Sequence, residues 1–326
     1  MVCPIDYTKL SSGEKSLICM EGHHFPYIDE VPIMLLPDAI PTHVPHFTQT
    51  REMISKYQND ADPRESPKTE NLIDPYVQRE VAATCGTMYK NLIGHLKRYP
   101  IPRLPLSNGS NKVFLDIGCN WGRWCISAAS DGFFVVGIDP SFKAIQAAKR
   151  VSRQLGVNAI YLVADARYLP FAANCFDVIF SYSVLQHFDK NDAKKTIMEV
   201  RRLLKPSGFS LIQMLNFYGI RNQYNMLKRN FREPVSFEVR YWTPSELKKK
   251  FSELIGPTST FVDGFFSANV QMKDIDLLSF PYKCVISISQ FLKTISRCMP
   301  FMNAFADSLY LKSQVDPCKQ NGLHHL

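Results

Sequence analysis

Short apolar runs alternate with stretches of helical spacing through the middle of this chain. The apolar runs lie at about residues 112–117, 133–138, 160–164, 176–181 and 209–215. Between the second and third runs, apolar residues recur at helical spacing from Ile145 to Leu155, and Gly156 ends that pattern. Strands that alternate with helices predict an α/β fold built on a doubly wound, mostly parallel sheet.

The composition along the chain predicts three parts. Residues 1–45 hold several prolines and the phrase FPYIDEVPIML, which predict a small N-terminal module. Residues 46–73 include the polar stretch QNDADPRESPKTEN and predict a linker or mobile loop. The remaining residues, 74–326, are expected to form one large domain, and its last core helix is marked by the capping-box sequence TPSE at 243–246.

Two stretches of the large domain fall between predicted core elements. Residues 216–242 are rich in aromatic and basic side chains, and residues 271–305 carry an apolar helical pattern before the closing run DSLYLKS. Because the first stretch follows the fifth strand, it is expected beside the edge of the sheet where ligands bind. We expect both to be lid insertions, although the second could instead pack a homodimer.

A glycine turn breaks the first core strand in the segment KVFLDIGCNWGRW, residues 112–124. Gly118 can adopt a positive φ and lets backbone approach a ligand, while the amides that open the next helix face the same crevice. Asp139 ends the next apolar run about 20 residues later, the offset at which an acidic side chain meets ribose hydroxyls. The turn lacks the dinucleotide fingerprint, because Asn120 and Arg123 stand where glycines are required. The segment therefore predicts a nucleoside pocket that is not one for NAD or FAD.

Glycines at 118 and 122, with Asp116 just before the turn, resemble the first motif of class I S-adenosylmethionine (SAM) dependent methyltransferases. Asn120 replaces that family's central glycine, a mild change because Asn tolerates left-handed backbone. The resemblance implies SAM as cofactor and a Rossmann-like, seven-stranded sheet; the other interpretation is any α/β turn with two glycines. The cofactor residues that it implies are Asp116, Gly118, Cys119, Asn120, Gly122, Asp139, Pro140, Asp165, Ala166 and Ser181.

Three of those residues have particular roles by the same resemblance. Asp165 ends the third run and would accept a hydrogen bond from the adenine amino group, while the Ala166 backbone meets the ring. Ser181 would end the fourth strand beside the methyl group. The upstream helix would cover this pocket, so Tyr76 and Tyr89 could contact adenosine or the acceptor, or could simply pack that helix.

The N-terminal phrases CPID and LICMEGHHF resemble a zinc-ribbon-like domain found in small methyltransferase activator proteins. Each of its two knuckles keeps one cysteine, Cys3 and Cys19, while Asp6 and Gly22 occupy the second positions. The site looks eroded, so we expect no bound metal. The alternative is a zinc ion held by Cys3, Asp6, Cys19 and His23, since sulfur, nitrogen and oxygen all serve as ligands.

Methyl transfer from a sulfonium requires a dry pocket and correct approach more than a protein nucleophile. An alcohol acceptor would still benefit from a base, and His187 in SYSVLQHF is the candidate, although it could instead be a capping or core histidine. The fourth strand is followed by Ser181, Tyr182 and Ser183, where enzymes that methylate amino groups of bases or glutamine carry an Asp/Asn-Pro-Pro-aromatic motif, so an exocyclic base nitrogen is disfavoured as acceptor. We expect methylation of oxygen on a small or glycan-like acceptor. The alternatives are a non-catalytic SAM-binding regulatory or partner-recruiting module and, less favoured, an RNA methyltransferase.

Composition and charge bear on the partners and the cellular location of the protein. The chain has 326 residues, 45% of them hydrophobic, and a net charge of +8. Basic residues of the first insertion, Arg221, Lys228, Arg229 and Arg232, could clamp an anionic acceptor or form a solvated helix face. Without an arginine-rich tail or an RNA-binding motif, nucleic acid is disfavoured as a partner. Nine scattered cysteines, no signal pattern and no long apolar run predict a cytoplasmic protein without a transmembrane segment.

Overall fold

The computed structural model describes residues 1–59, 72–106, 108–267, 270 and 272–316. Most of the polar stretch QNDADPRESPKTEN lies outside these residues. A seven-stranded sheet forms the centre, in the order β10-β11-β9-β8-β5-β6-β7. Its strands are β5 (Val113–Ile117), β6 (Phe134–Asp139), β7 (Ile160–Val163), β8 (Phe176–Tyr182), β9 (Leu204–Leu215), β10 (Thr258–Gly264) and β11 (Ser308–Gln314). The five strands from β5 to β9 pair in parallel, and β11 pairs antiparallel with both β9 and β10. This arrangement confirms the predicted doubly wound, mostly parallel sheet.

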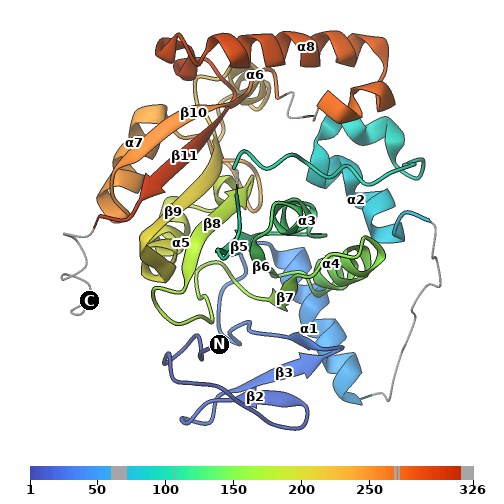
Figure 1. The fold of residues 1–326 in the computed structure, drawn as a ribbon, viewed down its shortest axis with the longest axis vertical. Helices are drawn as coiled ribbons and strands as arrows, with labels where there is room; N and C mark the ends of the chain where they lie inside the picture. The colour runs from blue at the N-terminus through green and yellow to red at the C-terminus, as the bar shows by residue number, and fades with distance from the viewer. Residues whose placement is uncertain (60–71, 107, 268–269, 271, 317–326) are drawn as a thin grey trace.

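Helices cover both faces of the sheet (Figure 1). They include α3 (Arg123–Ser130), α4 (Phe142–Gln154), α5 (Lys190–Leu203) and α7 (Pro244–Leu254). Side chains of a strand alternate between faces, so Leu115 and Ile117 pack in one cluster with residues of α5 and α7, such as Phe251. Phe114 points to the other face and packs in a cluster with residues of α3 and α4, such as Trp124. The capping box of α7 is present as predicted.

The N-terminal module is a small antiparallel sheet that lies against the edge strand β7. Its strands are β1 (Ser11–Ser12), β2 (Ser16–Ile18), β3 (His24–Ile28) and β4 (Val31–Pro32). Just after β4, Ile33 forms a parallel bridge with Val163, and the Met34 N–H donates to the Val163 carbonyl oxygen at 2.7 Å. Leu17 and Phe25 belong to the same buried cluster as the core strands. The module is therefore continuous with the core of the large domain.

The prediction of a linker over residues 46–73 is wrong for 46–59, because helix α1 spans Val44–Asn59. Phe47 is fully buried. The Thr50 hydroxyl donates to the Pro140 carbonyl oxygen at 2.9 Å and accepts the Phe142 N–H at 3.0 Å. These contacts with the start of α4 hold α1 in place. They join residues far apart in the sequence, so local composition does not indicate them.

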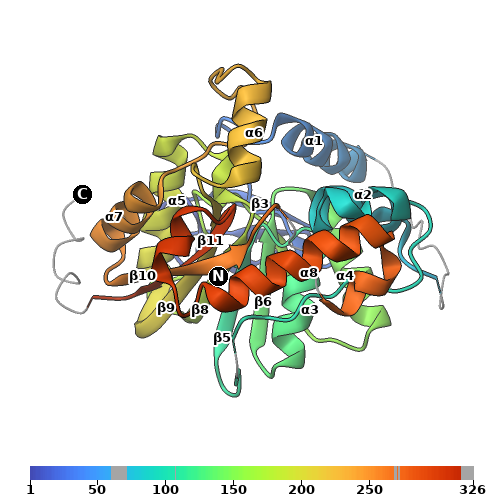
Figure 2. The ribbon, with the colours of Figure 1, turned by 90° about the horizontal axis from the view of Figure 1, so that it is seen from above.

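The predicted insertions lie over the end of the sheet that carries the site (Figure 2). Helix α2 (Pro75–Cys85) and the short η1 (Thr87–Leu92) precede β5. The first insertion contains α6 (Ile220–Lys228). The second contains η3 (Met272–Leu277), α8 (Phe280–Ile295) and η4 (Pro300–Ala304).

Within the described part of the chain, none of the helices has the length and apolar character needed to cross a bilayer.

Candidate functional site

A cavity of about 410 Å³ opens at the carboxyl ends of the central strands, within the usual size range of small-molecule sites. The turn after β5, the loops after β6, β7 and β8, and helices α1 and α2 all contribute to it. Eight of the predicted site residues line it: Gly118, Cys119, Asn120, Asp139, Pro140, Asp165, Ala166 and His187.

The turn after β5 is held in left-handed backbone at three positions. Gly118, Asn120 and Gly122 have φ values of 73°, 47° and 79°. The Asn120 side-chain oxygen accepts the N–H of Trp121 at 2.8 Å, which stabilises its own turn. A Cβ atom on Gly118 would lie 2.3 Å from a methyl carbon of Val184, so glycine is required there. Asn120 thus adopts the left-handed backbone that its side chain tolerates, at the position of the family's central glycine.

Asp139 faces this turn from the end of β6 and is 6% exposed. One carboxylate oxygen accepts the Asn120 N–H at 3.0 Å, and the other accepts the Ser141 N–H at 2.9 Å. Burial raises the pKa of Asp139 to about 6, so the carboxylate is ionised at neutral pH but is costly to keep charged. Each oxygen has a further lone pair, which could accept a hydroxyl group of a ligand.

Asp165 lines the cavity, but its carboxylate is already engaged by Arg167. Oδ1 accepts the backbone N–H and Nε of Arg167 at 2.9 and 3.0 Å, and Oδ2 accepts the terminal guanidinium nitrogen at 2.6 Å. Arg167 also donates to Asp192 at 3.0 Å and to the Ile40 carbonyl oxygen at 2.6 Å. An adenine amino group would have to share Asp165 with this arginine, and the role predicted for Asp165 stays a prediction.

Asp116, Gly122 and Ser181 do not line the cavity. Asp116 is buried behind the turn, accepts the Cys125 thiol at 3.3 Å, and has its pKa raised by burial to about 7. Gly122 permits close packing of α3, since a Cβ atom there would lie 2.6 Å from the Tyr161 hydroxyl. These two residues support the turn from behind.

Ser181 is fully buried, and its hydroxyl donates to the Ile117 carbonyl oxygen at 2.9 Å. It therefore joins two strands. Strand β8 runs to Tyr182, one residue beyond its predicted end, and Tyr182 and Ser183 line the cavity in place of Ser181.

His187 lines the cavity from the loop after β8. Its Nδ1 lies 2.7 Å from the Phe237 carbonyl oxygen, and its ring stacks on the Phe237 ring with centroids 4.1 Å apart. A carbonyl oxygen only accepts, so Nδ1 carries the hydrogen and Nε2 keeps a lone pair in the neutral ring. Burial lowers the pKa of His187 to about 4, which keeps the ring neutral at physiological pH.

Two further histidines of the cavity were missed by the sequence analysis. His43 and His46, at the start of α1, lie with their ring centroids 3.7 Å apart, and the His43 ring is 4.1 Å from that of Phe237. Burial lowers the pKa of both, that of His43 to about 4. The sequence HVPH, residues 43–46, falls at the predicted boundary between the N-terminal module and the linker, and nothing local in it indicates contact with the strand ends.

Tyr76 and Tyr89 of the upstream segment have different positions. Tyr76 lines the cavity, whereas the buried Tyr89 donates its hydroxyl to Asp274 of the second insertion at 2.8 Å. Tyr89 therefore joins η1 to η3 of the second insertion and does not line the cavity.

The basic residues of the first insertion are not brought to the cavity. Arg232 pairs with Glu238 at 2.8 Å, and Arg229 donates to the Val239 carbonyl oxygen at 3.0 Å. Arg123, at the start of α3, lines the cavity instead, and its guanidinium lies 5.3 Å from the ring centroids of Trp124 and of Tyr182. In the sequence, Arg123 is notable only for standing where the dinucleotide fingerprint requires a glycine.

Known proteins are similar to parts of this chain. Residues 114–208 match the family described as "Methyltransferase domain". A ubiquinone biosynthesis O-methyltransferase of Coxiella burnetii is 29% identical over 147 residues, which cover 41% of this chain and 62% of the relative. One of Saccharophagus degradans is 33% identical over 110 residues, covering 33% of this chain and 45% of the relative. A solved structure from Thermotoga maritima, described as a SAM-dependent methyltransferase and possible histamine N-methyltransferase, is 11% identical, with a TM-score of 0.44 over 83% of this chain and all of that chain.

The chain spans about three fifths of the length of the first curated relatives that it matches. Residues 114–208, which match the methyltransferase family, contain the glycine turn after β5, Asp139, the parallel strands β6 to β8 and all of β5 except Val113. This part of the chain is similar to methyltransferase domains, and the residues around Asp139 fit SAM as the cofactor.

Proposed function

We propose that the chain transfers the methyl group of SAM to an oxygen atom of a small-molecule or glycan-like acceptor. The observation that carries the proposal is the position of His187: a neutral imidazole whose Nδ1 is held by the Phe237 carbonyl oxygen, so that Nε2 keeps its lone pair, lies in the same cavity as Asp139 and the Gly118 turn. Relatives whose names specify O-methyltransferases support oxygen as the acceptor atom.

The cofactor part of the cavity comprises the Gly118 turn, Asp139, Pro140 and Ala166. Asp139 would accept the ribose hydroxyls, and Gly118 would allow the backbone to approach closely. When bound, SAM supplies an electrophilic methyl group, so the chain's residues need only orient the acceptor and exclude water. Arg123 would bind a carboxylate, that of the cofactor's methionine part or that of an anionic acceptor.

The acceptor part of the cavity is lined by flat rings, among them His43, His46, Tyr182 and Phe237. His187 Nε2 would take the proton of the acceptor hydroxyl as the oxygen attacks, and the Phe237 carbonyl oxygen would hold the ring in the required tautomer. The low pKa of His187 makes it a weak base. An acidic hydroxyl such as a phenol therefore fits better than a simple alcohol, because the proton transfer is less uphill.

The second candidate is a SAM-binding regulatory or partner-recruiting module without turnover. It would use the same cofactor residues. The Asp165 carboxylate is already bonded to Arg167, so adenine would be held differently from the family pattern, and this observation favours the second candidate.

We also expect a reducing, cytoplasmic environment, which is supported by eight free cysteines among the described residues.

The test is transfer of labelled methyl groups from SAM to a panel of phenolic, carboxylate, glycan and amine acceptors. His187→Gln should lower turnover by roughly 100-fold to 10,000-fold and leave SAM affinity unchanged. The control is His95→Gln, which alters an exposed histidine outside the cavity. Full turnover in His187→Gln would show that His187 is not the general base. SAM binding without any labelled product would favour the non-catalytic module.

A further inference from the structure

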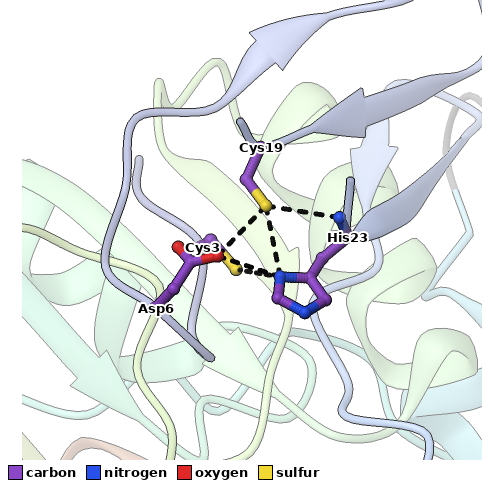
Figure 3. Close-up of side chains that lie close together, drawn as sticks. All are labelled: Cys3, Asp6, Cys19 and His23. Carbon is purple, nitrogen blue, oxygen red and sulfur yellow. Dashed lines mark hydrogen bonds and ion pairs between the residues drawn. The ribbon is translucent and has the colours of Figure 1, made fainter. Parts of the chain in front are cut away.

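Four side chains with metal-binding atoms converge in the N-terminal module (Figure 3). The residues that line the cavity do not include them. They are Cys3, Asp6, Cys19 and His23, and one ligand atom from each lies within 4.8 Å of all the others. Cys3 and Cys19 are buried, whereas Asp6 and His23 are half-buried. His23 Nδ1 lies 2.9 Å from Asp6 Oδ2, 3.2 Å from Cys19 Sγ and 3.6 Å from Cys3 Sγ.

We propose that these four residues bind one zinc ion, independently of the methyl transfer proposed above. Tetrahedral zinc with bond lengths of about 2.3 Å to sulfur and about 2.0–2.2 Å to nitrogen and oxygen places its ligand atoms roughly 3.3–3.8 Å apart. The distances of 2.9, 3.2 and 3.6 Å from His23 Nδ1, and 3.2 Å from Cys19 Sγ to Asp6 Oδ2, lie within a few tenths of an ångström of such edges. A small outward movement of the side chains would admit the ion.

The chemistry of the donor set favours zinc. Two thiolates and an imidazole suit zinc and exclude calcium and magnesium, which prefer oxygen ligands in larger number. Four protein ligands complete a tetrahedron and leave no open position, as in structural zinc sites. The ion would therefore hold the module together and would not activate water.

Neighbouring groups already orient the ligand atoms. The Ile5 N–H donates to Cys3 Sγ at 3.4 Å, and the His23 N–H donates to Cys19 Sγ at 3.3 Å; both bonds stabilise thiolates. The Thr8 N–H and hydroxyl donate to Asp6 Oδ1 at 2.8 and 2.6 Å, which directs Oδ2 toward the cluster. Hydrogen bonds of this kind around the ligands are typical of metal sites.

The turn between β2 and β3 brings Cys19 and His23 to the same point. Gly22 has a φ of 83°, and the Gly22 N–H donates to the Cys19 carbonyl oxygen at 3.1 Å. The sequence favoured a site without metal because each knuckle has only one cysteine. In the folded chain, Asp6 and His23 stand at ligand distance in place of the missing cysteines.

Zinc content decides the proposal. The untagged chain, purified without chelators, should contain about one zinc ion per molecule by elemental mass spectrometry. Cys19→Ser and His23→Ala should each lose most of it. The matched control is His24→Ala, which changes the adjacent, exposed histidine and should keep the zinc.

A second measurement on the unsubstituted chain covers the case in which the variants do not fold. Zinc is removed with a chelator and replaced by cobalt, whose absorption reports the ligands directly. A thiolate-to-cobalt charge-transfer band, intense visible bands typical of tetrahedral cobalt, and a lower melting temperature after chelation are expected. A zinc-free chain that gives no such bands on cobalt addition, or zinc retained in a Cys3→Ser/Cys19→Ser double variant, would overturn the proposal.

Discussion

Replacing Asp139 by Asn tests the cofactor site most directly. The amide keeps the shape of the side chain but offers one acceptor oxygen, whereas the carboxylate accepts two backbone N–H groups, from Asn120 and Ser141. A hydrogen bond to a charged group contributes about 1.5–3 kcal/mol. The loss of one such bond to the ribose corresponds to roughly 10-fold to 100-fold weaker SAM binding.

The pH dependence gives a second, sharper signature of Asp139. Its pKa is raised to about 6, so the ionised fraction falls from about nine tenths at pH 7 to about one tenth at pH 5. The Kd for SAM should therefore rise about tenfold over that range in the unsubstituted chain and stay nearly flat in Asp139→Asn. Asp116, whose pKa is raised to about 7, is present in both chains, so its contribution is common to both profiles.

Acid unfolding of the site would not mimic this result. The folded pKa of Asp139 lies above its ordinary value of 3.8, so the contribution of this group to stability is fully present below 3.8 and is lost as the pH rises through about 6. Between pH 7 and pH 5, SAM binding should weaken while this group makes the free protein more stable.

Isothermal titration calorimetry with SAM at pH 5, 6 and 7, together with thermal melting at each pH, measures both quantities. Asp131→Asn, which changes an exposed carboxylate at the end of α3, is the control. Equal pH profiles for the unsubstituted chain and Asp139→Asn, or unaltered affinity in the variant, would refute the reasoning.

Two further substitutions test the geometry of the site. Gly118→Ala should weaken SAM binding and destabilise the fold by about 1–2 kcal/mol through its left-handed backbone alone, and adding Val184→Ala should restore part of the loss by removing the 2.3 Å contact; calorimetry and melting measure both effects. Arg167→Met should lower the free energy of unfolding by about 3–5 kcal/mol, because it leaves Asp165 as an uncompensated buried charge. Urea denaturation would show recovery in Arg167→Met/Asp165→Asn, and equal stability of the single variant would contradict the pairing.

The core sheet could be predicted because its signals are local. Each strand from β5 to β8 is an apolar run bounded by turn residues, and the offset between Gly118 and Asp139 follows from the length of one strand–helix–strand unit. Strand β9 contains the predicted run 209–215 but begins earlier, at Leu204, and includes the polar and turn residues before that run. The predicted end of β8 was one residue short. Side chains alternate along a strand, so neighbouring residues at its end face opposite ways. Ser181 is therefore buried, whereas Tyr182 lines the cavity.

Features that depend on distant contacts could not be predicted. Helix α1 is stabilised by the bonds of Thr50 to Pro140 and Phe142, which lie far along the chain. Arg167 likewise reaches the carbonyl oxygen of Ile40. The histidines at the start of α1 became cavity residues only through these tertiary contacts, since nothing in their local sequence specifies the neighbouring strand ends.

The bridge between the N-terminal module and β7 has a consequence for association between chains. β7 is the last strand of the sheet, and an uncovered edge strand can pair with another copy. Ile33 and Met34 occupy the carboxyl end of that edge, where the Met34 N–H bonds to Val163. A chain shortened by its first 45 residues would expose this edge, and we expect it to aggregate through edge-to-edge strand pairing even if its own core still folds.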